Sequence, residues 1–182
     1  MEMLAREIST RYLLHMQSTA LLLDRLARLL QARAWVRGLN PAQAAALDYL
    51  ARANRFSRAP SHVADYLGTT RGTASQTLQA LARKGLVVAE ASADDRRSVS
   101  YRVTEKAGGD AAALPGDLMP DERATLDHLL GRMVRSLAAG GRTFGLCATC
   151  RHHRPGPACA LLKLALAPDE AGQLCHEHQP AD

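Results

Sequence analysis

The segment from Ser61 to Val103 constrains the fold of this chain more than any other. It contains, in order, an amphipathic helical stretch, a turn, a second helical stretch and two stretches rich in β-branched residues, at 62–67, 68–70, 71–84, 86–90 and 99–103. Ser61 is the expected N-cap of the first helix, and Gly85 ends the second. The order of helix, turn, helix and hairpin predicts a winged helix-turn-helix.

A compact polar face distinguishes the second predicted helix. Its inward positions are Ala74, Leu78 and Leu81, which recur at helical spacing. The polar positions on its other sides are Thr70, Arg71, Thr73, Ser75, Gln76 and Gln79. A helix set off by such a turn can enter the DNA major groove with polar residues leading. Any surface helix has a polar outer face, so it is the neighbouring turn and hairpin that favour contact with DNA.

The loop between the two predicted strands reads Asp94-Asp95-Arg96-Arg97. Arg96 and Arg97 at this tip can reach a minor groove, where the negative potential favours arginine. Residues 52–106 hold ten Arg and Lys against five Asp and Glu, a surplus of five, whereas residues 141–182 hold four of each. The positive charge therefore lies where phosphate contact requires it. The simpler alternatives are a solvated turn and a general surplus for solubility.

Long helices are predicted on both sides of this unit. Residues 1–36 carry an apolar stripe at three- and four-residue steps, broad enough to face a partner subunit. Asn40 and Pro41 begin a further helix, because Asn caps a helix and Pro suits its first turn. Another helix is expected at 120–139. Aromatic residues are only 4% while Ala and Leu are abundant, which favours a helical core.

The sequence also argues against several classes of protein. No apolar run reaches the roughly 18 residues of a membrane span, and the N-terminus lacks the pattern of a signal peptide. We therefore expect a cytoplasmic protein without a membrane partner. No Ser/His/Asp set, phosphate-binding glycine loop or HExxH motif is present, so no enzyme is predicted.

Over about residues 5–140 the chain resembles the MarR family of winged helix-turn-helix regulators. The motifs that carry the resemblance are Leu39-Asn40-Pro41-Ala42-Gln43, Ala64-x-x-Leu67-Gly68, Thr70 to Leu78, Lys84-Gly85-Leu86-Val87 and Asp95-x-Arg97-Ser98. The resemblance implies a mainly α fold with a small β-hairpin wing. It also implies a homodimer in which about 5–36 and 120–139 intertwine. In such a dimer the helix from Arg71 reads the major groove of a palindromic operator, and Arg97 reaches the minor groove.

All four cysteines lie in the last fifth of the chain, at Cys147, Cys150, Cys159 and Cys175. Clustered cysteines in a cytoplasmic protein favour metal ligation over disulfides. Only the first two form a C-x2-C pair, whereas structural zinc sites more often have two such pairs. Single, widely spaced cysteines suit an iron–sulfur cluster such as 4Fe–4S, in which each iron takes one cysteine. The spacing favours this cluster slightly over zinc, and it loosely resembles the small iron–sulfur subunits of some glycyl-radical enzymes.

Two further readings of the tail stay open. Free thiols would act as a redox switch through disulfides. Four histidines are alternative metal ligands, although a solvated position is the ordinary expectation for each: His152, His153, His176 and His178.

We therefore predict a MarR-like domain at 1–140, with the helix-turn-helix at 61–85 and the wing at 86–103, followed by a cysteine-rich metal-binding tail at 141–182. The expected function is a DNA-binding transcriptional regulator, a repressor, whose operator binding responds to a metal or redox centre in the tail. The alternative is a winged-helix adaptor for protein partners, or an enzyme accessory protein, with a purely structural metal centre. The basic surplus at 52–106 argues against the adaptor.

Overall fold

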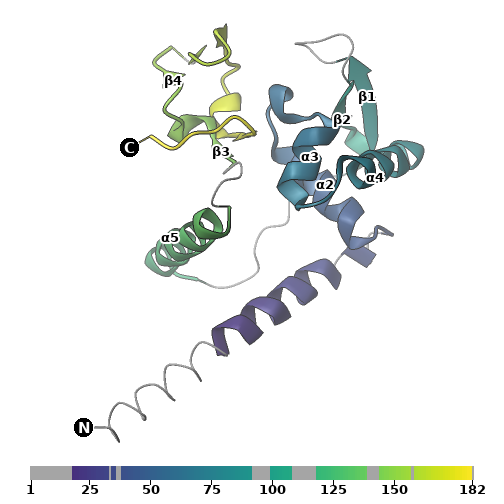
Figure 1. Cartoon of the computed structure of the whole chain (residues 1–182), viewed down its shortest axis with the longest axis vertical. Helices are drawn as coiled ribbons and strands as arrows, with labels where there is room; N and C mark the ends of the chain where they lie inside the picture. Colours follow the sequence, from purple (N-terminus) through teal and green to yellow (C-terminus); the bar gives the residue numbers. More distant parts are fainter. Residues whose placement is uncertain are drawn as a thin grey trace, which may run out of the picture. The chain divides into compact units, whose positions relative to one another are not determined.

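The fold is that of a computed structural model of the chain (Figure 1). The structure describes residues 18–32, 34–35, 38–91, 99–107, 118–138, 144–156 and 158–181. The chain forms two compact units, Met1–Ala44 and Ala45–Asp182. The predicted domain boundary near residue 140 lies within the second unit and stays a prediction. Among the described helices, none has the length and apolar character that crossing a membrane requires.

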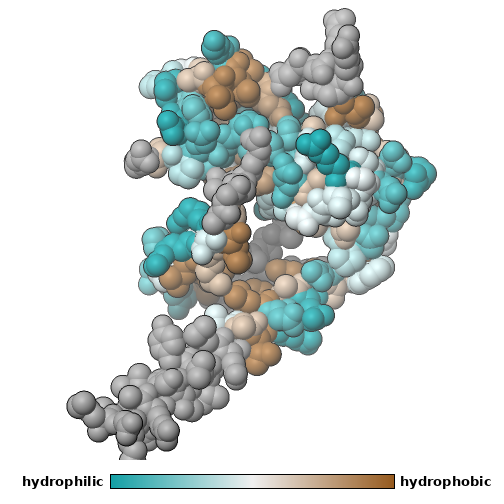
Figure 2. Space-filling model, in the orientation of Figure 1, coloured by the Kyte–Doolittle hydropathy of each residue, from teal (hydrophilic) through white to brown (hydrophobic). Residues whose placement is uncertain are grey.

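A long helix dominates the first unit and is drawn in purple in Figure 1. It is described at 18–32 and 34–35, which confirms that part of the predicted helix at 1–36. Its leucines are largely exposed, with exposed fractions of 68% for Leu21, 67% for Leu22 and 50% for Leu29. Apolar surface is visible on this helix in Figure 2. Within the described residues, this part of the predicted apolar stripe is therefore exposed.

Helix α2 (Pro41–Arg52) begins where the sequence predicts. The side-chain oxygen of Asn40 accepts a hydrogen bond from the Gln43 N–H at 2.8 Å, and Gln43 Oε1 accepts one from the Asn40 N–H at 3.4 Å. This reciprocal pair satisfies two of the N–H groups that a helix start leaves without a partner. The short 3-10 helix η1 (Arg55–Ser57) follows α2.

Helices α3 (Pro60–Leu67) and α4 (Arg71–Arg83) form the predicted helix-turn-helix. The N-cap of α3 is Ala59, without a side-chain hydrogen bond, so the predicted cap Ser61 is wrong. A proline already has the φ angle of a first helical turn and has no N–H to satisfy, which lets the helix begin before the serine. Gly68 ends α3 at φ 60°, a conformation that glycine adopts without a Cβ clash.

The core of this region consists of the apolar positions that helical spacing predicts. Each of the following side chains is no more than 1% exposed: Tyr49, Leu50, Val63, Ala64, Ala74, Leu78 and Leu81. They come from α2, α3 and α4 and give these helices a common buried side.

The wing is an antiparallel hairpin of β1 (Val87–Ala91) and β2 (Val99–Val103). Val87 pairs with Val103 at one end, and both Val87 and Tyr101 are buried. The pairing confirms the predicted hairpin. Its tip, with Arg96 and Arg97, lies outside the described residues. The 3-10 helix η2 (Glu105–Ala107) follows.

Helix α5 (Pro120–Leu137) covers most of the predicted helix at 120–139. The Met119 N–H donates to Glu122 Oε2 at 2.9 Å, which supports its first turn. No residue of this described helix is buried, and Leu137 is 88% exposed. The other exposed apolar side chains of α5 are Leu129, Met133 and Val134. Like the purple helix, α5 has an apolar side without cover in the single chain (Figure 2).

The tail consists of turns and two-residue strands. β3 (Gly145–Leu146) pairs with β7 (Leu174–Cys175), and β5 (Ala158–Cys159) lies between β4 (His153–Arg154) and β6 (Leu164–Ala165), all antiparallel. Two 3-10 helices complete it, η3 (Cys147–Thr149) and η4 (Glu170–Gly172). This small, irregular unit has little regular secondary structure of its own.

Candidate DNA-binding surface and cysteine pocket

The outer face of α4 presents the side chains that the sequence singles out for DNA contact. Ser75 is half-buried, and the exposed members of the set are Thr70, Arg71, Thr73, Gln76 and Gln79. The opposite face buries Ala74, Leu78 and Leu81 in the core. Helix α4 is therefore fixed by its apolar side and leaves a compact polar side accessible.

The start of α4 is held by Thr70. Its hydroxyl oxygen accepts a hydrogen bond from the Thr73 N–H at 3.2 Å and lies 2.9 Å from Thr73 Oγ1, so Thr70 caps the helix. The Thr77 hydroxyl donates to the Thr73 carbonyl at 2.9 Å. These bonds order the first turns of the helix, whose remaining N–H groups give its N-terminus partial positive charge.

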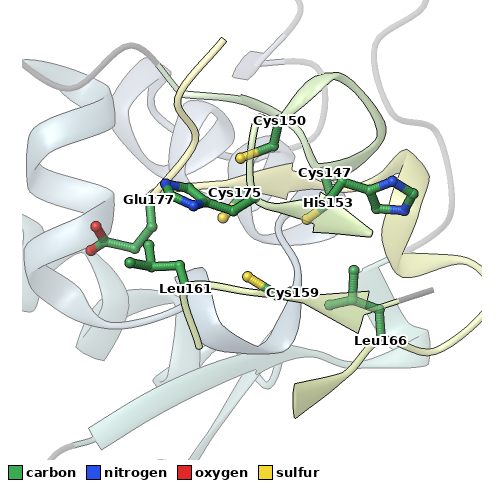
Figure 3. Close-up of a pocket in the computed structure, with 9 residues that line it drawn as sticks. Cys147, Cys150, His153, Cys159, Leu161, Leu166, Cys175 and Glu177 are labelled. Atoms are coloured by element: carbon green, nitrogen blue, oxygen red, sulfur yellow. The ribbon is translucent and has the colours of Figure 1, made fainter. Parts of the chain in front are cut away.

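All four cysteines line one pocket in the tail, drawn in Figure 3, where their sulfur atoms lie around a common space. Cys147 belongs to η3, Cys150 follows it, Cys159 lies on β5 and Cys175 on β7. None of the four forms a disulfide. Thiols that are up to 28 residues apart in sequence (175 minus 147) are thus brought to a single site.

An apolar shell surrounds the thiols. Cys147 and Cys175 are each 6% exposed and pack with the buried Leu166. Phe56 of η1 packs against the same cluster, so a residue of the winged-helix region contacts these buried side chains. Leu161 also lines the pocket (Figure 3), although 42% of it is exposed. Low polarity around a metal site limits access of solvent to it.

Hydrogen bonds single out two of the sulfurs. A bond between Cys147 and Cys175 lowers the pKa of Cys175, because the partner thiol stabilises the thiolate, while burial acts in the opposite direction. Asn54 and Ser57 side chains and the Glu177 backbone N–H lower the pKa of Cys175 further. Metal ligation requires the thiolate form, which these contacts favour at Cys175. The same bond between the two cysteines, together with burial, raises the pKa of Cys147 and so favours its thiol in the absence of a metal.

The histidines of the tail occupy different environments. His176 is only 4% exposed, so a solvated position is wrong for this residue. His178 Nε2 lies 3.0 Å from the Thr149 hydroxyl, and its ring covers Gly145 so closely that a Cβ there would clash. His152 and His153 both line the cysteine pocket, and the Nε2 atom of each is buried with no hydrogen-bond partner in the described protein.

The tail packs on the segment between α2 and α3. Arg55 Nη1 pairs with Glu170 Oε2 at 2.7 Å, and Arg55 Nη2 donates to the Ala165 carbonyl at 3.1 Å. Ala53 and Leu174 form a parallel β-bridge. The sequence does not predict this docking, because nothing in the spacing of 53–57 distinguishes an interface from a solvated basic loop.

The four thiols share one pocket, but they do not form a preset site for a single ion. In the described part of the chain, no group of three or more His, Cys, Asp or Glu side chains is placed to hold one. A tetrahedral zinc ion needs all its sulfurs about 2.3 Å from one point, and the bond between Cys147 and Cys175 already brings two of them close together. A polynuclear cluster would bind its cysteines further apart, one to each iron.

The fold and the exposed face of α4 define a winged helix-turn-helix protein. The sequence model of the MarR family matches residues 37–98, a stretch that contains helices α2, α3 and α4 and strand β1. The resemblance seen in the sequence is thereby confirmed for this region. The family match ends before the tail, and no curated protein matches the chain.

Solved structures of regulators share the fold. The transcriptional regulator PA3341 is 27% identical, with 67% of this chain and 97% of that one covered and a TM-score of 0.54. The MarR family transcription regulator SP03579 is 19% identical, with 71% and 92% covered and a TM-score of 0.55. MepR of S. aureus, solved as a complex with DNA, is 20% identical, with 65% and 96% covered and a TM-score of 0.50.

Proposed function

We propose that this chain is a DNA-binding transcriptional regulator that acts as a repressor, binds palindromic double-stranded DNA as a homodimer, and responds to a metal centre in its tail. The observation that carries DNA binding is the exposed polar face of α4 on a MarR-family domain. MarR-family regulators are transcription factors and not enzymes. The similar fold of MepR, which was solved with DNA, supports the same partner for this chain.

Charge supports the nucleic-acid partner. The surplus of five basic residues in 52–106 suits a phosphate backbone. Arg71 stands at the N-terminus of α4, where the helix dipole adds partial positive charge. In the proposed complex, Gln76 and Gln79 face base edges, since an amide can pair with the N6 and N7 of adenine. Arg96 and Arg97 follow the minor groove beside them.

Two uncovered apolar surfaces support the homodimer. One is the row of exposed leucines at 21–29, and the other is the side of α5 that ends at Leu137. Monomeric proteins rarely leave long apolar stripes in water. A closed two-fold dimer would cover the same surfaces on both copies, and it would place two α4 helices about one DNA turn apart, ~34–36 Å, as a palindromic site requires.

A metal centre accounts for the tail. Fewer than about 40 ordered residues rarely form a stable unit without disulfides, metals or a partner. The four cysteines are free thiols, they line one pocket, and they are the soft ligands that zinc and iron–sulfur clusters prefer. The residues present therefore fit a metal centre ligated by Cys147, Cys150, Cys159 and Cys175.

The spacing of the cysteines favours an iron–sulfur cluster slightly over zinc. Only Cys147 and Cys150 form a C-x2-C pair, whereas structural zinc sites more often have two such pairs. Two buried histidine Nε2 atoms beside the pocket have no partner in the described protein, and cluster sulfides would accept from them. Such a cluster supplies redox sensitivity set by its charge, hydrogen bonds and exposure. Zinc is the alternative occupant.

The experiment that tests DNA binding is selection of bound duplexes from a random pool, followed by titration of the enriched sequence. We expect a palindromic sequence whose affinity falls steeply as salt rises, because lysine and arginine contacts release counterions. A reporter gene placed behind that sequence should be silenced by the protein. Absence of any enriched duplex would favour the adaptor instead.

A further inference from the structure

Asn54 connects the winged-helix region to the cysteine pocket. It follows α2, is only 1% exposed, and donates its backbone N–H to the Leu174 carbonyl at 2.9 Å. Its side-chain Nδ2 donates to Cys147 Sγ at 3.3 Å. A side chain from the winged-helix region is therefore bonded to one sulfur of the proposed centre.

The side-chain oxygen of Asn54 indicates that the N–H groups of this amide have a function. Asn54 Oδ1 is buried and has no hydrogen-bond partner in the described protein. Burying a polar atom without a partner costs free energy, so the amide is unfavourable here unless its N–H groups are useful. The acceptor of the side-chain N–H is the Cys147 sulfur. Hydrogen bonds to ligand sulfurs orient the ligands of a metal and adjust its properties.

His176, directly after Cys175, makes a second connection. Its backbone N–H donates to Ser57 Oγ at 2.9 Å, and its ring Nε2 lies 2.9 Å from Asp65 Oδ2. The ring also stacks on His62, with centroids 3.9 Å apart. His62 and Asp65 belong to α3, the helix that positions α4 in a helix-turn-helix. The strand that carries Cys175 is thus fastened to α3.

We propose that Asn54 and His176 transmit the loading of the cysteine pocket to α3, and through α3 to the DNA-binding face of α4. The inference rests on the proposed metal centre and holds for either metal. A metal-bound thiolate is a stronger hydrogen-bond acceptor than a thiol, so loading strengthens the bond from Asn54 and emptying weakens it. Because His176 directly follows Cys175, a change at the Cys175 sulfur reaches α3 within one residue.

This route differs from the one that sequence order suggests. In the sequence, the tail follows the helix at 120–139, so loss of the metal would be expected to act through the end of that helix. The segment that joins α5 to the tail, 139–143, lies outside the described residues. The contacts of Asn54 and His176 instead bypass α5 altogether and lead directly to the helix-turn-helix.

Operator affinity of metal-loaded and metal-free protein tests the proposal. The variants are Asn54→Leu, which keeps the shape of the side chain but removes the N–H donor, and Asp65→Ala, which removes the carboxylate that His176 contacts. Asp169→Ala is the matched control, because that exposed carboxylate bonds only Gln173 within the tail. Metal content is measured on every sample, and fluorescence anisotropy on the selected duplex gives the affinity.

In the wild type we expect the two states to differ in affinity by about 5- to 150-fold, the usual range of allosteric coupling. Both variants should retain metal, but their metal-loaded and metal-free forms should bind the duplex with nearly equal affinity. The control should keep the wild-type ratio of the two affinities. Reciprocity requires that operator DNA also changes metal retention against a chelator, and that the variants lose this effect.

The possible outcomes distinguish failure of the proposed route from failure of the proposed metal regulation. Variants that retain metal and keep the full ratio would overturn the proposed route while the regulator function stands. If Asn54→Leu loses its metal, the ratio of affinities measured for Asp65→Ala decides whether the route holds, because Asp65 does not line the pocket. A wild type that binds the duplex equally well with and without metal, or that binds no metal, would overturn both this inference and the proposed modulation.

Discussion

His176 Nε2 lies 2.9 Å from Asp65 Oδ2, so two residues 111 positions apart in the sequence are bonded across the contact between the tail and α3. His176 is 4% exposed, whereas the side chain of Asp65 is 47% exposed. The histidine of this contact is therefore buried in the tail, whereas the carboxylate on α3 is accessible to solvent. It makes the tail a structural neighbour of the DNA-binding unit, with consequences for stability as well as for regulation.

Arg55→Ala should loosen the tail. The substitution leaves the Glu170 carboxylate, whose side chain is 5% exposed, with the Ala167 N–H as its remaining hydrogen-bond partner among the described residues. We expect a loss of about 1–3 kcal/mol in the free energy of unfolding, between the values for exposed and buried ion pairs. Denaturant unfolding measures it. Arg102→Ala, which breaks the exposed pair with Glu90, is the control and should cost less than about 1 kcal/mol.

Gln76→Ala should relax base preference more than it lowers non-specific affinity, because the side chain is exposed on the face of α4 that is proposed to meet base edges. Arg97→Ala should weaken operator binding by about 1–3 kcal/mol, as loss of a specific base contact does. Binding to the selected duplex and to a scrambled one gives both numbers. Unchanged curves for both variants would contradict the proposed surface.

Leu22→Glu should produce monomers that no longer bind a palindromic duplex, because a charge would then lie within the exposed apolar stripe. Arg25→Glu, at an exposed polar position of the same helix, controls for added negative charge. Sedimentation velocity at micromolar concentration measures the association. A monomeric wild type would refute the dimer.

Ser replacement of any one of the four cysteines should lower metal content and change operator affinity. The thiols share one pocket, so each is expected to supply one ligand. The loss should be large for Cys147 and Cys175, which are buried and cannot be replaced by solvent. Elemental analysis after anaerobic purification checks this. Equal metal content in all four variants would place the metal elsewhere.

The sequence predicts the winged helix-turn-helix well, because local rules determine it. Thr70 caps α4 through its own hydroxyl, and Ala74, Leu78 and Leu81 fall on one side by spacing alone. The metal-ligand candidates could also be named, since cysteine is rare and clustered. Spacing did not reveal that the four thiols share one pocket, or that Phe56 packs against the cluster that contains two of them.

The contacts between the tail and the helix-turn-helix could not be predicted. Asn54, Ser57 and Asp65 are ordinary polar residues in a loop and a helix, and their partners lie more than 90 positions away. Such pairings depend on tertiary packing, which no local pattern specifies. The error at Ser61 has a local cause, because Pro60 can begin a helix without a side-chain cap.

The most direct test of the account is the iron, acid-labile sulfide and zinc content of wild-type protein purified without oxygen. A cluster held by Cys147, Cys150, Cys159 and Cys175 predicts a brown protein with about four iron and four sulfide per chain, as in 4Fe–4S proteins. One zinc per chain without sulfide would contradict the cluster and leave a metal-responsive tail. Colourless protein without iron or zinc would contradict the metal centre and leave a thiol switch.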